Sequence, residues 1–150
     1  MNGVAVFDKK IKGFVKFTQK PDGVIVHGKL QGLKKSSTHA IHIHKFGDLT
    51  KKCTSMSGHF NPFNQPHGGR NDKKRHVGDL GNIQSDAQGR AVFRFKDRHI
   101  SLRHSKRNVI GRGLVIHNGT DDLGKTCHPN SSTTGNAGPR RDCAVIGICR

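Results

Sequence analysis

The sequence predicts a single all-β domain over residues 1–150, a sandwich or barrel of about eight short strands with two long loops. Three observations predict this class. The chain has 150 residues, the length of one domain. All ten acidic residues are Asp and 19 residues are Gly, whereas a helical bundle normally carries many Glu residues on its solvent faces. The apolar residues, 31% of the chain, fall in short runs separated by turn residues or polar stretches.

The first strands follow one another closely. Residues 3–8, 12–19 and 24–31 alternate apolar with other side chains and recur roughly every ten positions, which predicts an antiparallel meander. Pro21-Asp22-Gly23 predicts a turn between the last two, because Pro fixes φ and Gly admits a positive φ. Residues 38–45 predict a further strand.

Two long polar loops divide the rest of the chain. Residues 48–75 and 118–142 have no sustained period, and loops of this length are uncommon unless they are functional or disordered. Between them we expect strands in residues 82–89, which end in the turn sequence Asp86-Ala87-Gln88-Gly89, in 90–97 and in 113–117. Residues 143–149 predict the last strand. We therefore expect function to lie in the two loops.

The chain is strongly basic, with 27 Lys and Arg residues against ten acids and a formal net charge of +17. The cations are spread along the chain, no nucleic-acid motif accompanies them, and there is no Trp or Tyr on which bases could stack. The charge therefore predicts weak, salt-sensitive and non-specific polyanion binding rather than specific nucleic-acid recognition.

The sequence shows no targeting or membrane-spanning segment. No apolar run approaches 18 residues, and residues 1–6 lack the regions of a signal peptide, so we expect a cytoplasmic protein with no membrane partner. The four cysteines fit neither a zinc ribbon nor a CxxC redox motif, and they allow three full pairings. The default expectation is free thiols in a reducing compartment.

Eleven histidines in 150 residues are more than solvation requires. His42 and His44 alternate with Ile41 and Ile43, so in a strand both imidazoles leave the same face while both isoleucines face the core. Such a pair is half of a metal site. Five others are expected on the surface or in turns and not as ligands: His27, His39, His99, His104 and His128.

The first long loop completes a metal-binding pattern. His59, His67, His76 and Asp79 fall within 21 residues, and three imidazoles with one carboxylate form a tetrahedral zinc donor set. A loop without apolar anchors would gain order from the metal. The alternative is a solvated polar loop with chance histidines. His117 ends an apolar strand and could supply a further ligand.

These residues lie in a series of motifs that resembles the copper/zinc superoxide dismutase family. The resemblance runs from near residue 3 to the C-terminus. It is carried by His42-Ile43-His44-Lys45-Phe46-Gly47-Asp48, Cys53-Thr54-Ser55, Gly58-His59-Phe60-Asn61-Pro62, His67-Gly68-Gly69, Arg75-His76-Val77-Gly78-Asp79-Leu80-Gly81-Asn82, Ile110-Gly111-Arg112, Leu114-Val115-Ile116-His117, Asp121-Asp122-Leu123-Gly124, Thr134-Gly135-Asn136-Ala137-Gly138, Arg140 and Cys143-Ala144-Val145-Ile146-Gly147.

The resemblance implies a Greek-key β-barrel and a role for each matching residue. Copper would be held by His42, His44, His59 and His117. Zinc would be held by His59, His67, His76 and Asp79, with His59 as an imidazolate that bridges both metals. Asp121 would orient ligands of both metals through hydrogen bonds. Arg140 would attract and position the substrate anion, and Cys53 and Cys143 would form a disulfide, which is an exception to the reducing-compartment default.

The implied reaction is the conversion of superoxide to oxygen and hydrogen peroxide, with copper alternating between Cu(II) and Cu(I) and zinc redox-silent. Relatives often carry a charged rim of Glu and Lys before the arginine. Residues 128–133 carry none, so steering would depend on Arg140, Arg141 and the overall field.

Two other functions remain alternatives: a metal-binding but inactive homologue that serves as a copper buffer or decoy, and a polyanion-binding protein on the same scaffold. The resemblance also implies a homodimer and, as a partner, a copper-delivery chaperone. It assigns no role to Cys127 or Cys149.

Overall fold

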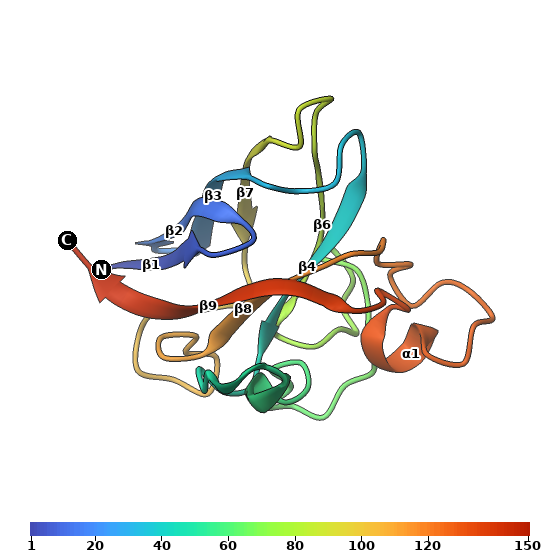
Figure 1. The fold of residues 1–150 in the computed structure, drawn as a ribbon. Coiled ribbons are helices and arrows are strands. Elements are labelled where there is room, and N and C mark those ends of the chain that lie inside the picture. The colour runs from blue at the N-terminus through green and yellow to red at the C-terminus, as the bar shows by residue number, and fades with distance from the viewer.

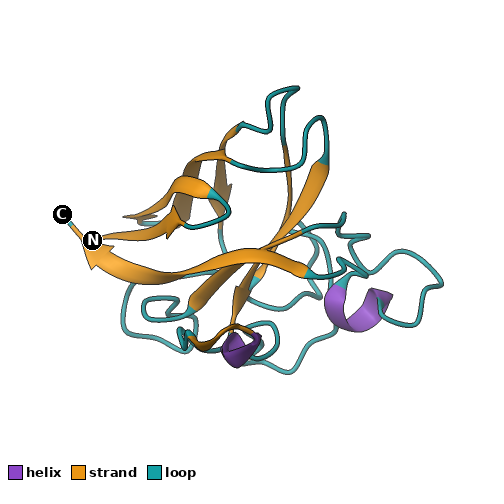
Figure 2. Ribbon diagram, viewed as in Figure 1, coloured by secondary structure: helices purple, strands orange, loops and turns teal.

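The computed structural model describes all 150 residues as an all-β domain with almost no helix (Figures 1 and 2). One antiparallel sheet of eight strands runs in the order β6-β4-β8-β9-β1-β2-β3-β7 and curls into a nearly closed barrel. The strands are β1 (Asn2–Asp8), β2 (Lys12–Lys20), β3 (Gly23–Gln31), β4 (Thr38–His44), β6 (Asp79–Gln84), β7 (Ala91–Asp97), β8 (Gly113–His117) and β9 (Arg140–Cys149).

Strand β9 joins the two halves of the barrel. Its first half pairs with β8, as in Cys143 opposite Val115, and its second half pairs with β1, as in Ile146 opposite Ala5. The sequence neighbours β3 and β4 therefore lie in different halves, and β7 returns to pair with β3. This connectivity is the Greek key of the expected barrel.

The predicted strands are confirmed, and the structure corrects several boundaries. Strand β6 begins at Asp79 rather than at residue 82, and β9 begins at Arg140 rather than at 143. The first long loop contains the short strand β5 (Thr50–Cys53) and a 3₁₀ turn (Thr54–Met56), which the sequence did not predict. The second contains one helical turn, α1 (Ser131–Thr134).

The predicted turn at 86–89 is confirmed, and its geometry requires glycine. Asp86 Oδ1 accepts the backbone N–H groups of Gln88 and Arg90, each at 2.9 Å. Gly89 has φ of 75°, and a Cβ there would lie 2.4 Å from the carbonyl oxygen of Leu33. A residue with a side chain would therefore be strained at this position.

The core fills the inside of the barrel. Phe17, Ile41, Ile43, Leu114 and Ile146 are fully buried in one apolar cluster contributed by both halves. The two isoleucines of β4 face this core, as the alternation predicts, so His42 and His44, which alternate with them, face the opposite side of the sheet. No helix in the chain has both the length and the apolar character needed to cross a membrane.

A candidate two-metal centre

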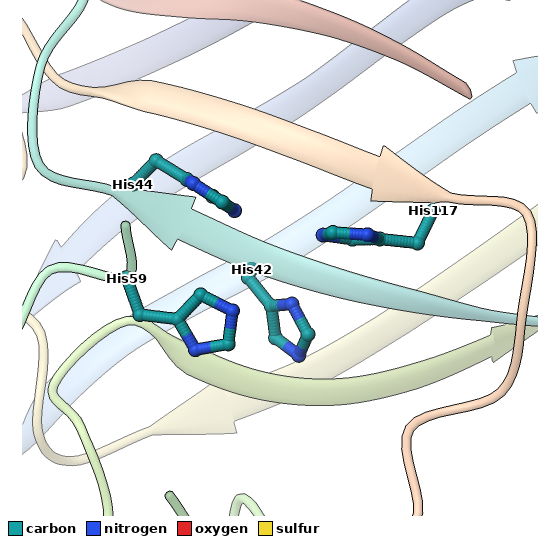
Figure 3. Close-up of side chains that lie close together, drawn as sticks. All are labelled: His42, His44, His59 and His117. Atoms are coloured by element: carbon teal, nitrogen blue, oxygen red, sulfur yellow. The ribbon is translucent and has the colours of Figure 1, made fainter. Parts of the chain in front are cut away.

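Four histidines converge on the side of β4 that faces away from the core (Figure 3). His42 and His44 come from β4, His117 ends the adjacent strand β8, and His59 comes from the first long loop. One ring nitrogen from each lies within 4.8 Å of those of the others. A β-bridge between His44 and His59 fixes the loop against the end of β4.

Three of these imidazoles share a pattern of hydrogen bonding that leaves one nitrogen free. His42 donates from Nε2 to Asp121 at 2.7 Å, His44 from Nδ1 to the carbonyl of Ser57 at 2.7 Å, and His117 from Nδ1 to the carbonyl of Gly138 at 3.0 Å. The other nitrogens, His42 Nδ1, His44 Nε2 and His117 Nε2, are buried without a hydrogen-bond partner. Because buried polar atoms are nearly always paired, three unpaired nitrogens in one cluster fit a metal ion.

A second cluster adjoins the first and contains the acidic ligand candidate. Asp79 Oδ1 lies 3.0 Å from His59 Nδ1, 2.9 Å from His67 Nδ1 and 3.2 Å from His76 Nδ1. Its other oxygen accepts the backbone N–H groups of Gly68 at 3.0 Å and His76 at 2.8 Å. Three imidazole nitrogens facing one carboxylate oxygen form a donor set suited to zinc.

His59 and Asp121 link the two clusters. The ring of His59 lies 4.1 Å, centroid to centroid, from that of His42, while its Nδ1 faces the second cluster. The Asp121 carboxylate accepts from His42 Nε2 and, through its other oxygen, from His67 Nε2, each at 2.7 Å. One carboxylate therefore sets the orientation of a histidine in each cluster.

Gly135 in the second loop makes room for this arrangement. Its φ is 70°, and a Cβ there would lie 2.0 Å from Asp121 Oδ1 and 2.5 Å from His67 Nε2. The close approach of backbone to the Asp121 carboxylate therefore excludes any larger residue.

Arg140 lies beside the four-histidine cluster. It donates from its two terminal nitrogens to the carbonyls of Cys53 and Ser57, and the Ser57 carbonyl also accepts from His44. Arg141 points elsewhere, to the carbonyl of Gly32 and to Asn118 at 3.1 Å. The carbonyl that Arg140 shares with His44 fixes its guanidinium next to the histidines.

The structure contains a Cys53–Cys143 disulfide between β5 and β9, so the default expectation of free thiols is wrong for these two residues. Cys127 is an exposed free thiol and Cys149 a half-buried one. The disulfide holds the first long loop against β9, and with it the carbonyl of Cys53 on which Arg140 rests.

Comparison with known proteins decides the family. A sequence profile described as copper/zinc superoxide dismutase matches residues 11–146. The chain belongs to the copper/zinc superoxide dismutase family.

Its relatives include superoxide dismutases and copper chaperones. The chain is 47% identical over its whole length to a Cu-Zn superoxide dismutase of Paramecium bursaria Chlorella virus 1, covering 80% of that protein. It is 50% identical to Cu-Zn superoxide dismutase A of Xenopus laevis, over 93% of this chain and 91% of that one. It is 47% identical to a copper chaperone for superoxide dismutase from Sus scrofa, over 91% of this chain but only 48% of the chaperone.

A solved structure supports the same assignment. The crystal structure of the clock protein EA4 superposes with a TM-score of 0.94 at 43% identity, covering 99% of this chain and 94% of that one. The fold therefore agrees with that of this relative over nearly the full length.

Three residues of this dismutase-family site were missed by the sequence analysis. Arg75 is buried, pairs with Asp97 at 2.7 Å and donates to the carbonyl of His76 at 2.9 Å, so it holds the second cluster against the end of β7. Asn82 exchanges hydrogen bonds with the backbone of Asp121 at 2.8 and 3.0 Å. Both lie inside the motifs that resemble the family, but nothing in their spacing signals a role.

His39 is the third, and its predicted surface position is wrong. It is fully buried and its Nδ1 donates to the carbonyl of His117 at 2.8 Å, so it supports a member of the four-histidine cluster from behind. His27, His104 and His128 are exposed and His99 is half-buried, as expected for histidines outside a site.

Burial controls the protonation of the first cluster. It lowers the pKa of His42 to about 3, that of His44 to about 2 and that of His117 to about 4, and it also lowers the pKa of His59. These imidazoles are therefore neutral near neutral pH, which is the form that binds a metal.

The carboxylates control the second cluster. Burial would raise the pKa of Asp79, but hydrogen bonds from three histidines hold it well below its ordinary value. Burial would likewise lower the pKa of His67, but hydrogen bonds to Asp121 and Asp79 raise it to about 9. Without metal, His67 therefore carries a positive charge between these two carboxylates.

We expect the metal-free protein to lose stability as the pH falls from 7 to 4. The unfolded chain protonates its histidines near 6.5, whereas folded His117 resists protonation until about 4, and His42 and His44 resist it to still lower pH. Below pH 6.5 the unfolded state therefore binds more protons and is favoured. The contribution of His67 to stability depends on pH in the opposite direction. It is fully present below pH 6.5 and is lost as the pH rises through about 9.

Urea titrations of chelator-treated protein at graded pH measure this dependence. A free energy of unfolding that stayed constant between pH 7 and 4 would contradict the burial of three neutral imidazoles.

Proposed function

We propose that this protein is a superoxide dismutase that converts superoxide to oxygen and hydrogen peroxide. The observation that carries the proposal is the first cluster: three buried imidazole nitrogens without partners face a fourth histidine, beside a fixed arginine. The donor set suits a metal that cycles between two oxidation states, since imidazole binds copper in both.

In this proposal His42, His44, His59 and His117 would hold copper. His59, His67, His76 and Asp79 would hold zinc, each of the three histidines having Nδ1 within 3.2 Å of Asp79 Oδ1. Copper supplies one-electron chemistry when it is bound. Asp121 accepts a hydrogen bond from Nε2 of His42 and another from Nε2 of His67. The Nδ1 atom of each ring is then the one that is left to bind a metal. His59 would use Nδ1 for the second cluster and Nε2 for the first, and Nε2 would hold a proton only when it is not bound to the metal.

Arg140 would bind and orient the superoxide anion. Its guanidinium keeps its charge at neutral pH, and two carbonyls fix its direction. An open cavity of about 650 Å³ beside it is also lined by Lys9, Lys10, Lys52 and Arg141. These cations supplement the attracting field in the absence of a charged rim on residues 128–133.

Replacing Arg140 by isoleucine tests this role. We expect Arg140→Ile to reduce superoxide turnover at least several-fold while copper, zinc and the disulfide are retained, because the residue contacts the substrate and no metal. Arg141→Ile is the matched control, since it removes the same charge from the neighbouring position but its side chain points to Gly32 and Asn118. The activity of the parent should also fall more steeply with ionic strength than that of Arg140→Ile.

Two results would overturn the proposal. Equal turnover in the parent and in Arg140→Ile would remove the arginine from the mechanism. Absence of dismutation by parent protein with full copper, zinc and disulfide content would favour an inactive metal-binding homologue. That alternative is supported by the copper chaperones among the relatives, of which the chain spans about half the length.

We also propose that the protein is a homodimer. Phe46 and Leu49 are 47% and 41% exposed, and Ile148 at the end of β9 is 70% exposed. The backbone of Gly47 lies close to the carbonyl of Gly111, and the N–H of Gly111 donates to the carbonyl of Ile146 at 2.7 Å. The segments that carry Phe46, Leu49 and Ile148 are therefore neighbours, and their exposed apolar side chains border one region of the surface. A copper-delivery chaperone with a domain similar to this chain would bind the same face.

Ile148→Asp tests the dimer. We expect it to shift the parent from dimer to monomer in sedimentation equilibrium, because a carboxylate cannot be buried without a partner. Val92→Asp, at a β7 residue that is 71% exposed, should leave the dimer intact. A parent that sediments as a monomer would refute the dimer.

A further inference from the structure

The outer face of β1, β2, β3 and β7 belongs to the half of the barrel whose strands carry none of the cluster residues, and we call it the basic sheet face. Strand registers place Phe14 beside Lys29, Lys16 beside His27, His27 beside Arg94 and Lys29 beside Val92. The two long loops, the second of which contains α1, extend from the other half of the barrel, so they leave this face uncovered (Figure 2). Its side chains on β2, β3 and β7 are Lys12, Phe14, Lys16, Thr18, Lys20, Ile25, His27, Lys29, Gln31, Val92, Arg94 and Lys96.

The charge of this face is almost entirely positive. Lys12, Lys20, Lys29 and Arg94 are exposed and Lys16 is half-exposed, and none of these five forms an ion pair. Lys96 is the exception, with Asp22 at 2.9 Å. Asp8, opposite Lys12, lies at the end of β1. A row of unpaired cations across adjacent strands is complementary to a chain of phosphates.

The face also carries aromatic and apolar surface between the cations. Phe14 is 37% exposed, and the ring of His27 meets it edge-on at 6.3 Å between centroids. Phe14 and Val92 line a surface groove of about 730 Å³ together with Lys12, Lys29 and Gln31. The groove also contains one carboxylate, that of Asp86, which pairs with Arg90 at 3.1 Å. Such a groove offers an apolar contact for a planar ring, amide groups for its edge and cations for the charge that it carries.

We propose that the basic sheet face binds single-stranded nucleic acid, with phosphates on Lys16, Lys29 and Arg94 and a base stacked on Phe14 in the groove. Aromatic side chains on an open sheet between cations form a stacking platform for unpaired bases. A duplex would bury its bases away from Phe14, and a sulfated polysaccharide has no planar ring to stack there. The binding is independent of the metal centre and of dismutase activity.

Two triple variants with the same charge test the location. Lys16→Ser, Lys29→Ser and Arg94→Ser remove two lysines and one arginine from the face. Lys51→Ser, Lys106→Ser and Arg103→Ser remove the same residue types from exposed positions elsewhere. Fluorescence anisotropy with a labelled 20-nucleotide oligo(dT) should show affinity reduced at least about tenfold by the first triple and less than about threefold by the second. The slope of log affinity against log salt concentration should become shallower by about 2 in the first triple, because each phosphate contact contributes about 0.7.

Phe14→Ala separates nucleic acid from other polyanions. We expect it to weaken oligo(dT) binding at least about fivefold, the effect of losing one base stack, and to leave heparin binding unchanged. The thermal unfolding of every variant is measured first, and Phe14→Leu, which keeps the apolar packing but not the aromatic ring, should weaken oligo(dT) binding like Phe14→Ala.

Three outcomes would overturn the proposal. Equal losses in the two triples would show a diffuse field rather than a binding face. An unchanged oligo(dT) affinity in Phe14→Ala would show that the face binds any polyanion. Tighter binding of a 20-base-pair duplex than of the single strand would exclude base stacking as the basis of recognition.

Discussion

We expect His59→Ala to lose copper and zinc together and to have no measurable dismutase activity. His59 contacts both clusters directly: its ring lies against His42 in the first, and its Nδ1 lies 3.0 Å from Asp79 and 3.1 Å from His76 in the second. Removing an outer partner of a ligand typically reduces metal affinity about 10- to 100-fold, and removing a shared ligand should reduce both affinities by more.

Metal content after dialysis against a graded chelator measures this effect. His67→Ala is the control, because both ring nitrogens of His67 face carboxylates, those of Asp79 and Asp121, although its ring also lies 5.4 Å from that of His42. We expect it to release zinc at much lower chelator concentration than copper. If His59→Ala retained the copper and zinc content of the parent, the shared-ligand assignment would be wrong.

The second large effect concerns the disulfide. Cys53 and Cys143 are 90 residues apart, so the bridge closes most of the chain into one loop. In the chain-entropy account a loop of that length stabilises the folded state by about 4.5 kcal/mol, a large fraction of the stability of a domain this size. We therefore expect the double variant Cys53→Ser, Cys143→Ser to lose about that free energy of unfolding.

The measurement uses metal-free protein in urea, because bound metal would add its own stabilisation. The control variant Cys127→Ser, Cys149→Ser removes the two free thiols and should change the free energy of unfolding by less than about 0.5 kcal/mol. Residual activity of the disulfide variant, once reloaded with metal, should also be reduced, because the carbonyl of Cys53 fixes Arg140. A double variant as stable as the parent would show that the bridge contributes nothing to folding.

Local pattern was sufficient for much of the fold. The period of two in residues 3–45 predicted β1 to β4 and placed His42 and His44 opposite Ile41 and Ile43, because successive side chains of a strand alternate between faces. The same alternation puts His39 on the core side with the isoleucines, where the structure buries it. The expectation of a surface position ignored that period.

The boundaries that were wrong have a different cause. Residues 79–81 are Asp-Leu-Gly and residues 140–142 are Arg-Arg-Asp, so neither stretch shows the alternation of apolar residues that indicates a strand. They become the starts of β6 and β9 because a neighbouring strand is already in place: Asp79 pairs with His42, and Arg140 with His117. Backbone hydrogen bonding to a partner decides strand formation where side-chain propensity is weak.

The sequence by itself determined the eight barrel strands apart from some of their ends, the candidate ligand residues and the family, since each depends on short motifs and their order. Only the tertiary structure decided which groups meet. It brings Lys9, Lys10 and Lys52 beside Arg140 from two separate segments, and it collects the unpaired cations of β2, β3 and β7 on one face. It also leaves one nitrogen free on each of three buried histidines by supplying Asp121, Ser57 and Gly138 as partners for the other. Long-range strand pairing sets these contacts, and the spacing of residues along a chain does not encode the direction from which a distant carbonyl or carboxylate arrives.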